Sequence, residues 1–282
     1  MNKVLIGRKQ ETETLKRAFD SSQPEFVAVV GRRRIGKTFL IKQVYKNDIQ
    51  FELTGLQYAT KSDQLKNFLF AFKRFYPDFE ISEYPSSWLD AFFLLSQAFD
   101  SVTTDTKQVI FLDEIPWMGT KRSGFIQGLG WFWNSWAVDK NIVLVICGSA
   151  ASWMIDKVIN DRGGLHNRVT QMVFLNPFTL SEIEQFLKNK NIRLNRYQIA
   201  QIYMSMGGVP MYLDQLEPGL SAVQNIQKVC FDKSGYLRKE FDRLFSSLFD
   251  NHEKYVRVIR ILADKKMGVT RGEIMKKAKL TN

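Results

Sequence analysis

The feature that most constrains the fold is an eight-residue segment, residues 31–38, that fits the pattern G-x-x-x-x-G-K-[ST]. An apolar, β-branched run at residues 26–30 precedes it, and helical spacing of apolar residues follows it. A glycine-bounded loop between a strand and a helix turns its backbone N–H groups inward, where they bind phosphate oxygens. The residues expected to contact a phosphate-bearing ligand are therefore Gly31, Arg32, Arg33, Arg34, Ile35, Gly36, Lys37, Thr38 and Phe39.

Two acids lie at the end of a second buried run, residues 108–113, and complete this prediction. Asp113 and Glu114 stand where that strand ends, and ligands bind at the carboxyl ends of strands in open α/β sheets. We expect Lys37 to reach the β- and γ-phosphates, and Thr38 and Asp113 to hold Mg²⁺. Glu114 is then placed to orient and deprotonate a water molecule. An adjacent glutamate favours hydrolysis, because transfer of phosphate to another substrate needs no base for water.

A third buried run, residues 142–147, ends near Ser149. Ser149 is predicted to contact the γ-phosphate or the attacking water, and the alternative is that it caps the following helix. Cys147, inside the run, is predicted to be a small apolar core residue without a catalytic role. The guanine-reading sequence N-K-x-D is absent from the chain, so ATP is the expected nucleotide.

Strand and helix patterns alternate along the first part of the chain, which predicts an α/β fold with a mainly parallel sheet. The predicted strands are residues 26–30, 49–53, 108–113, 142–147 and 169–175, and the predicted helices are residues 9–20, 62–75, 86–99 and 125–136. After Pro177 the pattern indicates helices alone, at residues 179–188, 196–206, 209–216 and 221–231. The expected domains are residues 1–176, 177–250 and 251–282.

The composition of the chain limits which kinds of partner and which cellular compartment we expect. The 40 Lys and Arg exceed the 29 Asp and Glu, and the net charge of +11 suits an anionic partner. Two cysteines and two histidines argue against a disulfide framework, a cysteine-rich zinc module and a histidine metal centre. Neither a signal-like start nor an apolar run of spanning length is apparent, so we expect a cytoplasmic protein without a membrane partner.

The last segment, residues 252–282, is strongly basic, with nine cations against three anions. Tyr255, Ile259 and Leu262 form one helical stripe, and Thr270 with Glu273 fits a helix capping box. Two such helices match the start of a helix-turn-helix, whose third helix would lie beyond Asn282. Because these cations can bind phosphates, DNA is a possible partner. The nine cations are Lys254, Arg257, Arg260, Lys265, Lys266, Arg271, Lys276, Lys277 and Lys279.

Aromatic residues are dense around residues 117–136. They predict either a stacking surface for bases or a hydrophobic core. The spacing of Phe132 and Trp136 favours the core, whereas Trp117 and Trp133 are the better candidates for contact with a partner. The three arginines of the loop either support phosphates, contact nucleic acid or face solvent.

Taken together, these motifs resemble the predicted archaeal and bacterial AAA-family ATPases of the STAND class of P-loop NTPases. The resemblance spans nearly the whole chain. The matching segments are Ile6-Gly7-Arg8 with Glu11, the loop at 31–38, FLDEIPW at 111–117, CGSA at 147–150, GGLHNR at 163–168, NPFTL at 176–180 and GGVP at 207–210.

The resemblance implies a P-loop NTPase domain of the ASCE/AAA-like kind, followed by an all-helical lid and a partial winged-helix segment. It implies that Gly7 and Arg8 line the nucleotide pocket and that Pro210 packs on the adenine. Arg168 would sense the γ-phosphate, with Arg162 as its substitute and a surface ion pair as the alternative. The implied activity is slow, Mg²⁺-dependent ATP hydrolysis that drives a conformational switch, with self-association in the ATP state. The alternative is a DNA-binding protein with a regulatory ATP site.

Overall fold

The computed structural model describes residues 4–102, 104–160, 163–240, 252–264 and 268–279. The chain divides into two compact units. Unit 1 comprises Met1–Phe186 and Gly208–Met211, and unit 2 comprises Leu187–Gly207 and Tyr212–Asn282. The domain limits expected from the sequence remain a prediction.

Unit 1 is built on a five-stranded sheet in the order β2-β3-β4-β1-β5, and every pair of neighbours is parallel. Its strands are β1 Glu25–Val30, β2 Ile49–Thr54, β3 Gln108–Asp113, β4 Ile142–Gly148 and β5 Gln171–Phe174. The three central strands β3, β4 and β1 are buried almost throughout, as expected for a parallel sheet that is covered on both faces. The structure thus confirms the α/β fold and its parallel sheet.

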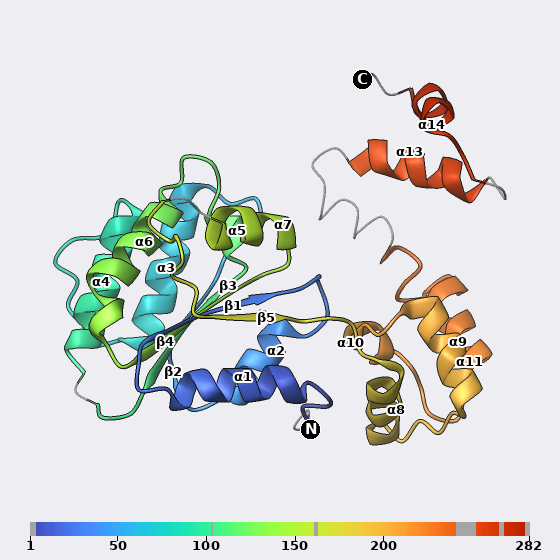
Figure 1. Ribbon diagram of the computed structural model, residues 1–282, viewed down its shortest axis with the longest axis horizontal. Coiled ribbons are helices and arrows are strands. Elements are labelled where there is room, and N and C mark those ends of the chain that lie inside the picture. The colour runs from blue at the N-terminus through green and yellow to red at the C-terminus, as the bar shows by residue number, and fades with distance from the viewer. Residues whose placement is uncertain (1–3, 103, 161–162, 241–251, 265–267, 280–282) are drawn as a thin grey trace. The chain divides into compact units, whose positions relative to one another are not determined.

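Helices cover both faces of this sheet (Figure 1). Along β1, Val27 and Val29 pack with α1 and α2, whereas Phe26, Ala28 and Val30 pack with α3, α4 and α6. Alternate residues of a strand point to opposite faces, so one apolar run serves two cores. The helices of unit 1 are α1 Lys9–Asp20, α2 Lys37–Val44, α3 Lys61–Phe75, α4 Trp88–Asp100, the short α5 Ile115–Met118, α6 Phe125–Ser135 and the short α7 Ala151–Met154.

Caps and aromatic packing explain where the larger helices begin and what they bury. Ser87 and Asp90 form a capping box at the start of α4. The ring of Trp88, the first residue of α4, lies edge-on to Phe125 of α6 with 4.9 Å between the ring centroids. Trp88 and Phe125 belong to the same hydrophobic core as Ile110 and Leu112 of β3, the strand whose carboxyl end carries the acids of interest.

The rest of the chain is helical, as predicted: within the described residues no strand follows β5. Thr270 and Glu273 form the expected capping box. The predicted helix at 209–216 is one short turn, and the helix at 221–231 is a helical turn followed by a π-helical turn. The elements are α8 Leu180–Asn189, α9 Arg196–Met206, α10 Pro210–Leu213, α11 Ala222–Ile226, the π-turn Gln227–Phe231, α13 His252–Ala263 and α14 Arg271–Ala278.

None of the helices in the described ranges combines the length and the apolar character needed to cross a bilayer.

Candidate functional site

The glycine-bounded loop joins the end of β1 to the start of α2. The Lys37 side chain is only 5% exposed, and its Nζ donates to the carbonyl oxygens of Gly31, at 2.9 Å, and Arg32, at 3.3 Å. The ammonium group therefore lies over the loop and donates to carbonyl oxygens of the loop backbone. Phosphate oxygens are stronger, charged acceptors in the same place, so the geometry suits an exchange of partners when an anion binds.

The two glycines of the loop are needed for different reasons. A Cβ at Gly31 would lie 2.5 Å from the carbonyl oxygen of Leu175, so close backbone packing excludes any side chain there. Gly36 has a φ of +91°, and no atom outside its chain neighbours lies within 4 Å of its Cβ position. The left-handed backbone of Gly36 leaves open space beside the start of α2, where free N–H groups at the start of a helix can bind an anion.

The structure brings the first acid to the loop. Thr38 Oγ1 donates to Asp113 Oδ2 at 2.8 Å, and the backbone N–H of Glu114 donates to Asp113 Oδ1 at 2.9 Å. Hydroxyl and carboxylate oxygens are the ligands that Mg²⁺ prefers, and Mg²⁺ takes few protein ligands beside phosphates and water. Among the described residues no cluster of three or more His, Cys, Asp or Glu side chains is assembled. Thr38 and Asp113 fit a magnesium ion that shares its other ligands with phosphate and water.

The second acid is held by the neighbouring strand. Glu114 adopts a left-handed backbone with φ 50°, and its Oε2 accepts the backbone N–H of Ser149 at 3.1 Å and the Ser149 hydroxyl at 2.9 Å. The Ser149 hydroxyl donates to Glu114, and helix α7 begins two residues later at Ala151. The structure thus joins the predicted sensor directly to the predicted base.

Cys147 has a contact that the sequence did not indicate. It is fully buried in the core, as predicted, but its Sγ also lies 2.6 Å from Asp113 Oδ1. Burial, and next the Asp113 carboxylate, raise the pKa of the Cys147 thiol well above its usual value. The thiol is therefore protonated at neutral pH and donates to Asp113. The prediction of a purely apolar role was incomplete, since adjacent strands bring Cys147 beside Asp113.

Arg8 lies behind the loop and connects it to other segments. Its guanidinium is 4% exposed, with Nη1 3.3 Å from Glu11 Oε1 and Nη2 donating to Ile35 O at 3.4 Å. It also lies over the ring of Phe178, 4.7 Å from the centroid. The backbone N–H of Phe178 donates to Gly208 O at 2.7 Å. These contacts gather the segments of Gly7, Arg8 and Pro210; contact of these three residues with a nucleotide stays a prediction.

Arg168 is not brought to the loop of its own chain, contrary to the prediction. It is exposed and lies just before β5, where the N–H of Thr170 donates to Phe26 O at the amino end of β1. The six residues of β1 separate that edge from the loop by roughly 20 Å, which is more than an arginine side chain spans. Arg162, its predicted substitute, lies outside the described residues.

The three arginines of the loop and the two tryptophans predicted to contact a partner differ in how far they are buried. Arg32 is exposed, Arg34 has a left-handed backbone with φ 72°, and the guanidinium of Arg33 lies 5.9 Å from the ring centroid of Trp117. Trp133 is only 3% exposed, and its ring packs 4.9 Å from that of Phe26. The prediction that Trp133 contacts a partner was therefore wrong, because its side of α6 faces the sheet.

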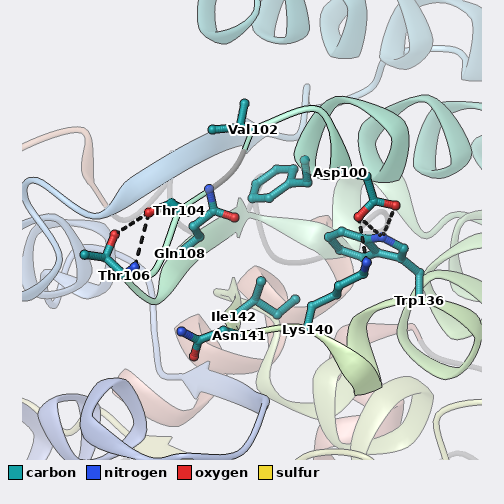
Figure 2. Close-up of a pocket in the computed structure, with 10 residues that line it drawn as sticks. Asp100, Val102, Thr104, Thr106, Gln108, Trp136, Lys140, Asn141 and Ile142 are labelled. Atoms are coloured by element: carbon teal, nitrogen blue, oxygen red, sulfur yellow. Dashed lines mark hydrogen bonds and ion pairs between the residues drawn. The ribbon is translucent and has the colours of Figure 1, made fainter.

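A separate hollow of about 290 Å³ lies at the amino ends of β3 and β4, at the opposite edge of the sheet from the loop. Figure 2 shows that Asp100, Trp136 and Lys140 point toward one another there. The Asp100 carboxylate accepts the indole N–H of Trp136 at 3.0 Å and pairs with Lys140 Nζ at 2.7 Å. Its charged groups neutralise each other, so this hollow is not the phosphate site.

Comparisons with known proteins identify the family of the chain. Residues 5–216 match the model of a family described as an ATPase domain predominantly from Archaea. An uncharacterized protein of Methanocaldococcus jannaschii is 24% identical over 262 residues, which cover 92% of this chain and 54% of that protein. This chain therefore spans about half the length of that relative. A second M. jannaschii protein, an uncharacterized ATP-binding protein, is 39% identical over 44 residues, or 16% of this chain and 75% of that protein.

Solved structures share the fold. The Walker-type ATPase of Pyrococcus abyssi superposes with a TM-score of 0.63 at 16% identity, covering 98% of this chain and 89% of the other. The Aeropyrum pernix ORC2 protein, solved in ADPNP–ADP complexes, gives a TM-score of 0.60 at 13% identity, covering 98% and 81% of the two chains. The family match extends over the loop, both acids and Ser149, and the chain belongs to the family of ATPase domains found predominantly in Archaea.

Proposed function

We propose that this chain binds ATP with Mg²⁺, hydrolyses it slowly and uses the nucleotide state to switch conformation. One observation carries the proposal. The carboxyl ends of three neighbouring strands bring together five predicted site residues, which are Lys37, Thr38, Asp113, Glu114 and Ser149. Hydrogen bonds join Thr38 to Asp113 and Ser149 to Glu114. A phosphate-binding loop, two magnesium ligands and a water-activating base are the parts that hydrolysis of a nucleoside triphosphate requires.

In the proposed mechanism each residue has one task. Lys37 leaves the carbonyls of Gly31 and Arg32 and pairs with the β- and γ-phosphates. Thr38 and Asp113 would hold Mg²⁺, which offsets the negative charge of the phosphates. Glu114 accepts the proton of the attacking water at its carboxylate, while Ser149 fixes the direction of that carboxylate. The Cys147 thiol keeps Asp113 oriented through its hydrogen bond to Oδ1.

The switch is supported by the contacts of Arg8. Its guanidinium touches both Ile35 in the loop and Phe178, and Phe178 in turn bonds to Gly208. If nucleotide binding displaces the loop, the contacts of Arg8 with Phe178, and of Phe178 with Gly208, should therefore change too. Binding shifts a conformational equilibrium only by its differential affinity for two states, and the proposal is that these contacts differ between the nucleotide-bound and the nucleotide-free state. Self-association in the ATP state is part of this proposal.

The test measures ATP binding and Mg²⁺-dependent phosphate release by the wild-type chain at several protein concentrations. For a self-associating ATPase we expect ATP binding and slow release of phosphate. The rate of phosphate release should increase more than linearly with protein concentration. Absence of nucleotide binding at millimolar ATP and Mg²⁺ would sink the proposal.

Replacing Ser149 with Ala is expected to slow phosphate release about tenfold without weakening ATP binding. The change removes the hydroxyl contact to Glu114 but leaves the backbone N–H contact, so the carboxylate is held less firmly. Single-turnover phosphate release and nucleotide affinity are measured on the same samples. A Ser149→Thr variant, which keeps the hydroxyl, serves as the control and is expected to retain most of the rate.

A second function, DNA binding with a regulatory ATP site, is supported by α13 and α14. The structure describes seven of the nine cations of this segment, and the side chains of all seven are exposed. Lys265 and Lys266 lie outside the described residues. The seven are Lys254, Arg257, Arg260, Arg271, Lys276, Lys277 and Lys279.

If DNA is a partner, affinity for duplex DNA should fall steeply with salt concentration. Each phosphate contact adds about 0.9 to the slope of log affinity against log salt. Replacing Lys276, Lys277 and Lys279 with Gln should lower the slope and the low-salt affinity for every DNA sequence alike. Fluorescence anisotropy from about 50 to 200 mM salt measures both quantities. No binding at the lowest salt concentration would remove this second function.

A further inference from the structure

The carboxylate of Glu182 joins two parts of unit 1 that are far apart in sequence. Its Oε2 accepts the backbone N–H of Thr179 at 2.8 Å and the Thr179 hydroxyl at 3.0 Å, as a capping box at the start of α8. Its Oε1 accepts the backbone N–H of Arg8 at 3.1 Å. A helix cap needs only the first set of bonds. The bond to Arg8, 174 residues away, requires a different explanation.

The turn at Gly7 and Arg8 is shaped to receive this carboxylate. Both residues have a left-handed backbone, with φ of 64° at Gly7 and 58° at Arg8. A Cβ added at Gly7 would overlap Oε1 and the carboxyl carbon of Glu182. Only glycine lets the carboxylate approach closely enough to reach the next N–H. Gly7 and Glu182 therefore fit each other.

Arg8 transmits the position of this turn to the phosphate loop. Its side chain is buried between Glu11, Phe178 and the carbonyl oxygen of Ile35, which directly precedes Gly36. A planar guanidinium held on three sides has little freedom, so a shift of the Arg8 backbone moves its contact with Ile35. The loop conformation that presents N–H groups to phosphate thus depends on where Glu182 holds Arg8.

We propose that Glu182 is a positioning residue of the nucleotide site, which fixes the Gly7–Arg8 turn and through Arg8 the conformation of the phosphate loop. This inference rests on the proposed ATP binding. It assigns Glu182 no contact with the nucleotide.

The charge state of Glu182 agrees with this role. Burial raises the pKa of Glu182, but hydrogen bonds from Thr179 and Arg8 outweigh burial and leave the pKa below its usual value. The side chain is therefore a carboxylate at neutral pH, and both of its oxygens accept. An amide offers one acceptor oxygen, so glutamine cannot serve Thr179 and Arg8 together.

Two variants separate the cap from the contact to Arg8. Asp is one methylene shorter than Glu: Glu182→Asp can keep the cap with Thr179 but cannot also reach Arg8. We expect this variant to stay folded, with a thermal midpoint lowered by only a few degrees, and to bind ATP and ADP about tenfold more weakly, while phosphate release at saturating ATP stays near wild type. Glu182→Gln leaves one acceptor oxygen for Thr179 and Arg8, so it should lose less affinity than Glu182→Asp. Glu13→Gln, at an exposed acid of α1, makes the same charge change and should behave as wild type.

A readout without nucleotide checks the contact itself. Hydrogen exchange at the Arg8 amide should be faster in Glu182→Asp than in wild type and unchanged in Glu13→Gln. Gly7→Ala should also weaken ATP binding. Combined with Glu182→Asp it should add little further loss, because both substitutions break the same contact.

The outcomes are distinct. If wild type binds no ATP, the proposed function fails and this inference falls with it. If wild type binds ATP and Glu182→Asp binds it equally well, the positioning role is overturned while the proposed function stands. A lower rate at saturating ATP with unchanged affinity would also overturn it, since Glu182 would then act on the chemical step.

Discussion

Replacing Glu114 with Gln is expected to reduce phosphate release from ATP by about 10² to 10⁴-fold, which is the usual contribution of a general base. Nucleotide binding should persist, because the amide has nearly the size of the carboxylate and can still accept from Ser149. Removing the negative charge next to the phosphates can even tighten binding. Single-turnover hydrolysis and equilibrium binding, measured on one preparation, separate the two effects.

The matched variant is Lys37→Ala, which should lose binding as well as release. The Lys37 ammonium is the cation that the loop holds at its centre, on the carbonyls of Gly31 and Arg32. Loss of release in both variants, with binding retained only by Glu114→Gln, is the expected pattern. Normal release by Glu114→Gln would show that another group activates water, and the assignment of Glu114 as the base would be wrong.

Replacing Gly208 with Ala is expected to lower the unfolding free energy of unit 1 by about 2–3 kcal/mol, the cost of inserting an atom into a close-packed contact. The added Cβ would overlap the carbonyl oxygen of Phe178 and lie 2.5 Å from its backbone nitrogen. The hydrogen bond from Phe178 to Gly208 would have to lengthen or break. ATP affinity should fall too, because Phe178 supports Arg8.

Gly130→Ala provides the control within the same unit. Its Cβ would be 3.5 Å from Gly164, an ordinary contact, and α6 should gain about 0.5–1 kcal/mol from the better helix former. All six tryptophans lie in unit 1, so urea unfolding followed by tryptophan fluorescence reports this unit alone. Equal midpoints for Gly208→Ala and wild type would contradict the tight packing of Gly208 on Phe178.

The sequence predicted the fold and the centre of the site because their signals are local. Continuous apolar runs bounded by polar residues mark buried strands, and β3 was found at its observed limits. The glycine pattern of the loop depends on backbone conformations of adjacent residues. Asp113 is the last residue of β3 and Glu114 follows it directly, so a parallel sheet places both at the same edge as the loop.

Other predictions failed where the outcome depended on which face a helix buries or where a connection runs. Helical spacing did not reveal that Trp133 faces the sheet, because α6 is apolar around most of its circumference. Arg168, which follows a glycine-rich segment, was predicted to sense the γ-phosphate. That segment instead leads into the amino end of β5, because a strand parallel to β1 must begin at the edge opposite the loop.

The sequence by itself determined the parallel α/β domain, the glycine-bounded loop and the place of the two acids, since each follows from residues that are neighbours in the chain. Only the tertiary structure decided that Cys147 donates to Asp113, that Ser149 holds Glu114 and that Glu182 fixes Arg8. These pairs are 34, 35 and 174 residues apart. Such contacts arise when strand order and helix packing bring distant backbones together, and no periodicity within one segment encodes them.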